Sequence, residues 1–120
     1  MQAIPAALDL SAYVGSMLQE VGIASFVVHF RFDGPHFTGI GVDGRWELRD
    51  ASGAISNYSA DGTPHPARQG FDALDATVVR ATVASPTSIR LEFDSGHALT
   101  LFSEQPGCES IHLYPLDLHF

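Results

Sequence analysis

The sequence predicts a small α+β domain, in which an N-terminal helix packs on a twisted antiparallel β-meander that is either open or rolled into a half-barrel. Three observations lead to this prediction. An apolar stripe with helical spacing runs through residues 9–21, later segments alternate apolar and polar residues, and turn-forming residues recur at short intervals. A chain of 120 residues predicts one domain, residues 1–120, and the turn spacing predicts roughly eight strands.

The predicted helix covers residues 9–21. Its apolar residues recur at intervals of three and four, as on one face of an amphipathic helix; they are Leu10, Tyr13, Val14, Met17, Leu18 and Val21. Asp9 is the candidate N-cap and Gly22 the candidate C-terminal stop. Because the polar face carries no cations, we expect this helix to pack across a sheet and not to lie on a membrane surface.

Two strands are expected next. Residues 23–32 place Phe26, Val28, Phe30 and Phe32 on one face, while His29 and Arg31 share the other. Residues 36–42 follow as a strand punctuated by Gly39 and Gly41, which indicate a bulge or a close backbone contact.

A hairpin turn at Asp43-Gly44 is predicted to lead into the strand at residues 45–49. In that strand Trp46 and Leu48 point inward, and the three charged residues between and beside them point outward. A weaker strand at 54–60 is anchored by Ile55, and the Gly- and Pro-rich residues 61–70 form an irregular loop.

The clearest pattern in the chain is a hairpin whose two strands both alternate; its apolar residues are Ile89, Leu91, Phe93, Leu99 and Leu101. A two-residue loop, Ser95-Gly96, would pair apolar with polar residues. A three-residue loop, residues 94–96, pairs Leu91 with Leu99, so that the apolar faces agree. We therefore predict the three-residue loop, with Gly96 in the left-handed conformation.

A last strand offers Ile111 and Leu113 as its inward face, and the apolar tail that ends at Phe120 is expected to pack down or to meet another chain. The core expected from all these faces comprises Leu10, Val14, Met17, Phe26, Val28, Phe30, Trp46, Leu48, Leu91, Phe93, Leu99, Leu101 and Ile111.

Charge is the outlying feature of the composition. The chain has fourteen acidic residues and six basic ones, all of them arginine, which gives a net charge of -8. Such a chain repels phosphate backbones and anionic membranes, so neither nucleic acid nor membrane is expected as a partner. An acidic surface can steer a basic protein toward it, although solubility alone also explains the charge.

The N-terminus, the length of the apolar runs and the cysteine count together predict where in the cell the protein lies. The N-terminus has no basic, apolar leader, no apolar run is long enough to span a bilayer, and Cys108 is the single cysteine. An intrachain disulfide is therefore excluded, and a cytoplasmic location is expected.

No catalytic motif occurs in the sequence. The six histidines make no metal-ligand spacing, and Cys108 has glutamates as neighbours, which would not lower the pKa of a thiol. Glu92 and Asp94 lie two apart on one strand and are best interpreted as a solvated face. We expect no enzyme, no cofactor and no metal; a histidine site that forms only in the folded protein stays open.

From Arg45 to Tyr114 the chain resembles a family of small uncharacterised bacterial α+β proteins. The resemblance rests on Arg45-Trp46-Glu47-Leu48, Leu74-Asp75-Ala76, the stretch SIRLEFDSGHALTLFSE and Glu109-Ser110. Proteins of this kind are similar to immunity proteins encoded beside polymorphic or contact-dependent toxins. The resemblance implies a non-enzymatic inhibitor that binds a basic toxin, such as a nuclease, and occludes its active site; it carries over no catalytic residue.

The residues expected to bind such a partner are acidic and lie near turns: Glu92, Asp94, Glu104 and Glu109. Two alternatives stay open. One is a small-ligand-binding or enzymatic domain with a pocket under the curved sheet, near Trp46, His29 or His112. The other is a structural module that self-associates, for example as a homodimer, through an edge strand or the tail.

Overall fold

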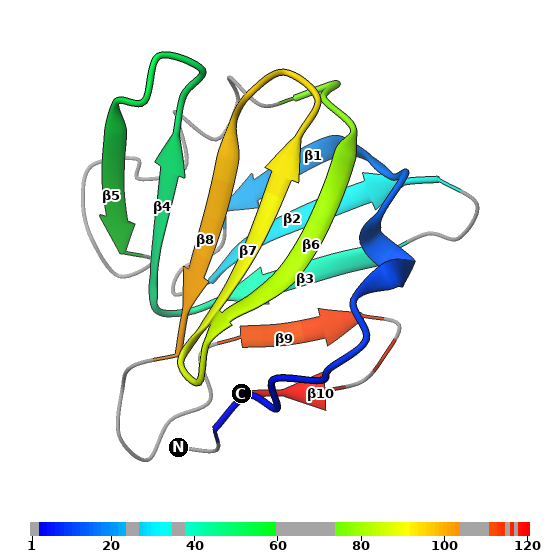
Figure 1. Cartoon of the computed structure of the whole chain (residues 1–120), viewed down its shortest axis with the longest axis vertical. Coiled ribbons are helices and arrows are strands. Elements are labelled where there is room, and N and C mark those ends of the chain that lie inside the picture. Colours follow the sequence, from blue (N-terminus) through cyan, green and yellow to red (C-terminus); the bar gives the residue numbers. More distant parts are fainter. Residues whose placement is uncertain are drawn as a thin grey trace.

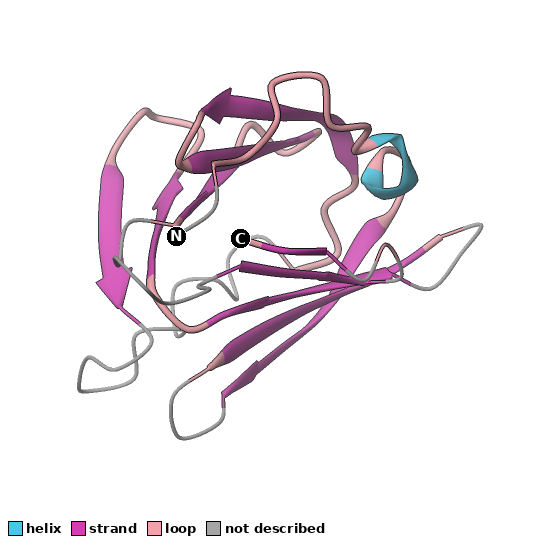
Figure 2. Cartoon of the chain, turned by 90° about the horizontal axis from the view of Figure 1, so that it is seen from below, coloured by secondary structure: helices cyan, strands magenta, loops and turns pink. Residues whose placement is uncertain are grey.

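The computed structural model describes residues 3–23, 27–34, 38–59, 74–103, 111–114, 116 and 118–120. It is nearly all β, with two five-stranded antiparallel sheets that face each other (Figure 1, Figure 2). The first sheet consists, in spatial order, of β1 (Met17–Ile23), β2 (Val28–Asp33), β3 (Thr38–Val42), β9 (Ile111–Tyr114) and β10 (Leu118–His119). The second consists of β5 (Ile55–Ser59), β4 (Arg45–Arg49), β8 (Ala98–Phe102), β7 (Ser88–Phe93) and β6 (Val78–Ser85).

The predicted N-terminal helix is wrong, and with it the α+β class. Among the described residues the only helical element is one 3-10 turn, η1 (Ser11–Tyr13), and β1 follows it directly. Gly15 has a φ of +86°, which no right-handed helix accommodates. Asp9 does not cap an α-helix; its carboxylate accepts a hydrogen bond from the Ser11 N–H at 2.9 Å.

A β-bulge explains why this segment looks helical. The register of β1 against β2 shifts between Leu18 and Glu20, so one extra residue separates the inward positions. Leu18 and Val21 are therefore both buried although they are three residues apart. Val14, which the helical stripe placed in the core, is instead 42% exposed.

The expected strand at residues 23–32 is two strands. Its first residue ends β1 and its later part is β2, and the two pair as an antiparallel hairpin with Ile23 opposite Val28. The predicted inward face is confirmed for Val28, Phe30 and Phe32, each 0% exposed; Phe26 lies outside the described residues.

Asp43-Gly44 is not a hairpin turn. The strands before and after it, β3 and β4, belong to different sheets, so these two residues carry the chain from one sheet to the other. The outward and inward faces predicted for β4 are confirmed, because Trp46 and Leu48 are buried. Ile55, the expected anchor of β5, is 47% exposed and anchors nothing in the core.

The three-residue loop between β7 and β8 is confirmed. Leu91 pairs with Leu99 and Ile89 with Leu101, and Gly96 has a φ of +87°. The predicted packing of the tail is also confirmed, since Phe120 is 4% exposed and its backbone exchanges two hydrogen bonds with Ile111.

The core lies between the two sheets. The ring of Phe30 from the first sheet meets the ring of Trp46 from the second edge-on, with centroids 5.3 Å apart. Most of the expected core residues are buried: Leu10, Val28, Phe30, Trp46, Leu48, Leu91, Phe93, Leu99, Leu101 and Ile111. Met17 is half-buried at one corner, where it pairs with Thr77 and links the sheets.

Candidate functional site

Arginines gather on the outer face of the second sheet, the face turned away from the core. In β4 and β7 every second residue is apolar and points inward, so the intervening residues of each strand point outward. Across the sheet these outward residues form a row in which Arg49 lies opposite Ala98, Ala98 opposite Glu92, and Glu92 opposite Arg80. A neighbouring row brings Glu47, Thr100 and Arg90 together in the same way.

A groove of about 650 Å³ runs over the first row. Its walls are the side chains of Arg49, Arg80 and Arg90, with His97 and the turn at residues 50–53 at one end. Its floor includes the small residue Ala98, which is only 3% exposed beneath the longer side chains. We call this the arginine groove.

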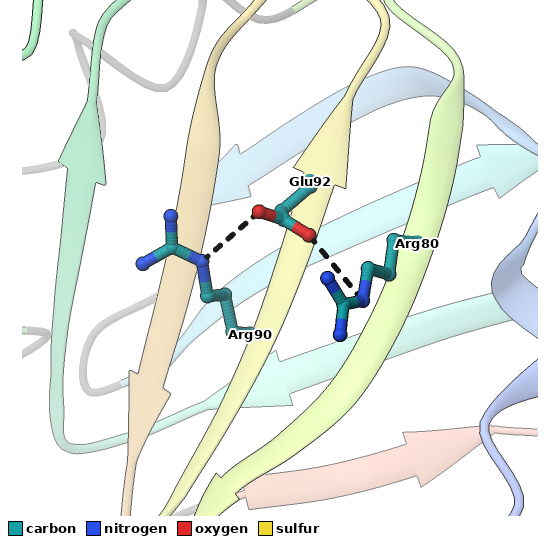
Figure 3. Close-up of polar contacts among 3 residues, drawn as sticks. All are labelled: Arg80, Arg90 and Glu92. Atoms are coloured by element: carbon teal, nitrogen blue, oxygen red, sulfur yellow. Dashed lines mark ion pairs between the residues drawn. The ribbon is translucent and has the colours of Figure 1, made fainter.

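Glu92 forms ion pairs with two of the arginines (Figure 3). Its Oε1 atom lies 3.6 Å from Nε of Arg90, and its Oε2 atom lies 3.7 Å from Nε of Arg80. Both ion pairs are made by Nε, so the Nη donors of the two guanidinium groups are not used in them. Within the described ranges, no ion pair or hydrogen bond reaches the guanidinium of Arg49.

The groove carries a positive charge in a protein whose net charge is -8. Three arginines line it against two carboxylates, Glu92 and Asp50. The Asp50 carboxylate faces its own turn, where its Oδ1 atom accepts hydrogen bonds from the hydroxyl and N–H of Ser52 and from the N–H of Ala54. These bonds, led by the one from the Ser52 side chain, lower the pKa of Asp50. The excess positive charge suits a carboxylate or phosphate group, which guanidinium groups bind in bidentate fashion.

The four acidic residues expected to bind a partner are placed as follows. Glu92 lies in the arginine groove, where Arg80 and Arg90 balance its charge. Asp94 lies at the β7–β8 turn, and its Oδ1 atom accepts a hydrogen bond from the Thr77 N–H at 3.0 Å. Glu104 and Glu109 lie outside the described residues.

Asp94 instead belongs to an acidic corner, which we define as Asp33, Asp75 and Asp94. Met17 pairs with Asp33 on one side and with Thr77 on the other, and the backbone of Asp94 bonds to Thr77. All three carboxylate-bearing residues are exposed, and none forms an ion pair with an arginine in the described part of the chain.

Of the residues expected near a pocket under the curved sheet, Trp46 is completely buried in the core, whereas His29 and His112 lie on the outer face of the first sheet. His29 lines a hollow of about 330 Å³ with Arg31, Ile40 and Tyr114. In the described ranges, no three histidine, cysteine or acidic side chains are placed to hold one metal ion.

Across the same ranges, none of the helical structure has the length and apolarity that a bilayer crossing requires.

Comparisons with known proteins gave no relatives: no family model, no curated protein and no solved structure matches the chain. The likeness to immunity proteins therefore has no support beyond the residues that suggested it.

Proposed function

We propose that this protein is a non-enzymatic binding protein and that the arginine groove receives an anionic group, a carboxylate or a phosphate, from its partner. The observation that carries the proposal is the concentration of Arg45, Arg49, Arg80 and Arg90, four of the six arginines, on one face of an acidic chain.

The geometry of the groove favours a bound anion over a purely internal salt bridge. Glu92 and Asp50 together balance two of the three arginine charges, and Glu92 pairs with the guanidinium groups of Arg80 and Arg90. Orienting donors before the ligand arrives lowers the entropy cost of binding. Arg49 stands across the Ala98 floor from them, so an anion between the two sides would meet donors from both.

Inorganic phosphate is the simplest probe of this site. In an NMR titration of the full chain, we expect the Nε–H signals of Arg49, Arg80 and Arg90 to shift together and saturably, while that of Arg31 on the first sheet stays in place. Two single variants, Arg49→Glu and Arg80→Glu, should each weaken phosphate binding by at least about tenfold, because each charged hydrogen bond contributes ~1.5–3 kcal/mol.

The matched control is Arg31→Glu, which makes the same charge change at an exposed arginine that pairs with Glu20 on the other sheet. It should leave phosphate binding within about twofold. Equal weakening by both kinds of variant would show that only net charge matters and would refute a defined anion site.

A second function, inhibition of a basic protein such as a toxin, is favoured by the acidic corner. Among the described residues, the part of the chain outside the outer face of the second sheet and its groove holds six acidic residues and one arginine, Arg31. For a basic partner we therefore leave Glu92 out of the candidate contact surface, keep Asp94, and add Asp33 and Asp75.

A pull-down from the native lysate at low and at moderate salt tests this second function. The bait should retain a basic protein, and less of that protein should be retained as salt rises. Reversing all three charges of the acidic corner should slow the association of this partner by about tenfold or more. Glu92→Gln is the control and should not slow association. If the three reversals leave the association rate unchanged, the acidic corner is not the contact surface.

A further inference from the structure

Histidines form a row on the outer face of the first sheet. His29 in β2 lies opposite Gly41 in β3, Gly41 lies opposite His112 in β9, and His112 lies opposite His119 in β10. Gly41 leaves room in this row, since a Cβ atom there would lie 3.4 Å from Nδ1 of His29 and 3.7 Å from Cβ of His112. The imidazoles come together only through strand pairing, because the sequence separates His29 and His112 widely.

The closest contact in the row joins His112 and His119. Ile111 and Phe120, the preceding pair, exchange both backbone hydrogen bonds, so His112 and His119 occupy a non-hydrogen-bonded pair, in which side chains approach most closely. Their Nδ1 atoms are 2.7 Å apart. At that distance one Nδ1 donates its proton and the other accepts it with its lone pair.

The Asp43 carboxylate lies beside the other ring nitrogen of His112. Its Oδ2 atom lies 3.5 Å from Nε2 of His112, on the side of the ring away from His119. A carboxylate there favours the proton on Nε2 and leaves Nδ1 of His112 with a lone pair. Metal-binding histidines are oriented in this way, with the second ring nitrogen donating to a carboxylate.

We infer that His112 and His119 form a two-ligand site for a divalent transition metal ion of the imidazole-preferring kind, Zn²⁺, Cu²⁺ or Ni²⁺. Metal–nitrogen bonds of about 2.0–2.1 Å place two adjacent ligand nitrogens about 2.9–3.4 Å apart. The distance between the two Nδ1 atoms therefore increases from 2.7 Å by only a few tenths of an ångström. The proton on Nδ1 of His119 moves to Nε2 of the same ring, which leaves Nδ1 free to bind the ion.

Among the described residues, no third histidine, cysteine or acidic side chain is placed to join the pair. The ion would connect β9 to the two-residue strand β10 and so fasten the C-terminus to the sheet. This inference is independent of the arginine groove, which lies on the other sheet.

Zinc chloride is the probe for the test. In the full chain, ¹⁵N NMR of the imidazole rings should show the Nδ1 signals of His112 and His119 shifting together with about one equivalent of Zn²⁺, and calorimetry should give the dissociation constant. Asp43→Asn keeps both ligands but removes the carboxylate, and should weaken zinc binding about 10–100-fold. His119→Ala should weaken it at least as much.

His97→Ala is the matched control, because His97 lies in the β7–β8 turn of the second sheet, with its Nδ1 atom 2.8 Å from the Ser95 hydroxyl oxygen. This variant should bind zinc as the parent does. Two results would overturn the inference: imidazole signals of His112 and His119 that stay in place at saturating zinc, or His119→Ala binding zinc as tightly as the parent. The first of these needs no variant to fold.

Discussion

Replacing Trp46 with alanine is expected to lower the free energy of unfolding by about 3–5 kcal/mol, the usual cost of removing a buried aromatic ring. The Trp46 side chain is completely buried, and its ring meets Phe30 of the opposite sheet edge-on at an interplanar angle of 82°. Its loss would therefore leave a cavity between the sheets and would weaken their contact as well as the packing of β4.

Urea denaturation followed by far-UV circular dichroism measures this change, since Trp46 is the single tryptophan and its fluorescence disappears with it. Ile55→Ala is the control. Ile55 lies on the edge strand β5 and is 47% exposed, so its truncation should change stability by no more than about 0.5 kcal/mol. Equal effects of the two substitutions would mean that the sheets do not pack through Trp46.

Strands that alternate strictly could be predicted from the sequence. In β4, β7 and β8 the apolar period of two assigns each side chain to a face, and only one loop length lets the faces of β7 and β8 agree. The choice of that loop placed Gly96 at a left-handed φ and fixed the pairing of Leu91 with Leu99, as the structure has them. Local rules were sufficient there, because the two strands are neighbours in sequence.

The N-terminal segment could not be predicted by the same reasoning. A bulge in β1 changes the spacing of Leu18 and Val21 from two to three, which is also the spacing on a helix face. The pairing of β1 with β2 stabilises the extended conformation, and a periodicity test cannot detect a partner strand. Gly15 adopts a left-handed φ, which is incompatible with a helix. The sequence does not show this, because glycine adopts positive and negative φ with similar ease.

The arginine groove was missed for a related reason. Alternation predicted that Arg45 and Arg49 point outward, but it did not show that β4 lies beside β8, and β8 beside β7. Without that order, Arg49 and Arg80 cannot be assigned to one row with Glu92 between them. Net charge was also misleading, because a single value of -8 averages over an arginine-bearing face and an acidic remainder.

Tyr13→Ala is expected to destabilise the fold by about 3–5 kcal/mol, again the cost of removing a buried aromatic side chain. Tyr13 is 0% exposed, and its hydroxyl donates toward the carbonyl oxygens of Gly39 and Tyr114, at 3.1 and 3.0 Å. These carbonyls belong to paired residues of β3 and β9, so the side chain ties the η1 turn to the first sheet. Tyr13→Phe keeps the ring and should cost only about 1–2 kcal/mol, the effect of one lost buried hydrogen bond.

The pH dependence of stability tests the contribution of the Tyr13 hydroxyl separately from that of the Tyr13 ring. Burial raises the pKa of Tyr13, and its hydrogen bond with Tyr114 opposes that shift less strongly. In the unfolded chain a tyrosine ionises near pH 10, at about its ordinary pKa. Above that pH the unfolded state loses a proton that the folded state keeps, so the stability of the parent falls as pH rises.

Denaturation measured at about pH 7 and at about pH 10.5 tests this. The parent should be more stable than Tyr13→Phe at the lower pH, and this difference in stability should shrink at the higher pH. Tyr114→Phe, which removes the hydroxyl of a tyrosine that is 45% exposed on the first sheet, is the control for the loss of a tyrosine hydroxyl. A constant difference between parent and Tyr13→Phe across that range would mean that the hydroxyl of Tyr13 is not held in the buried, un-ionised state.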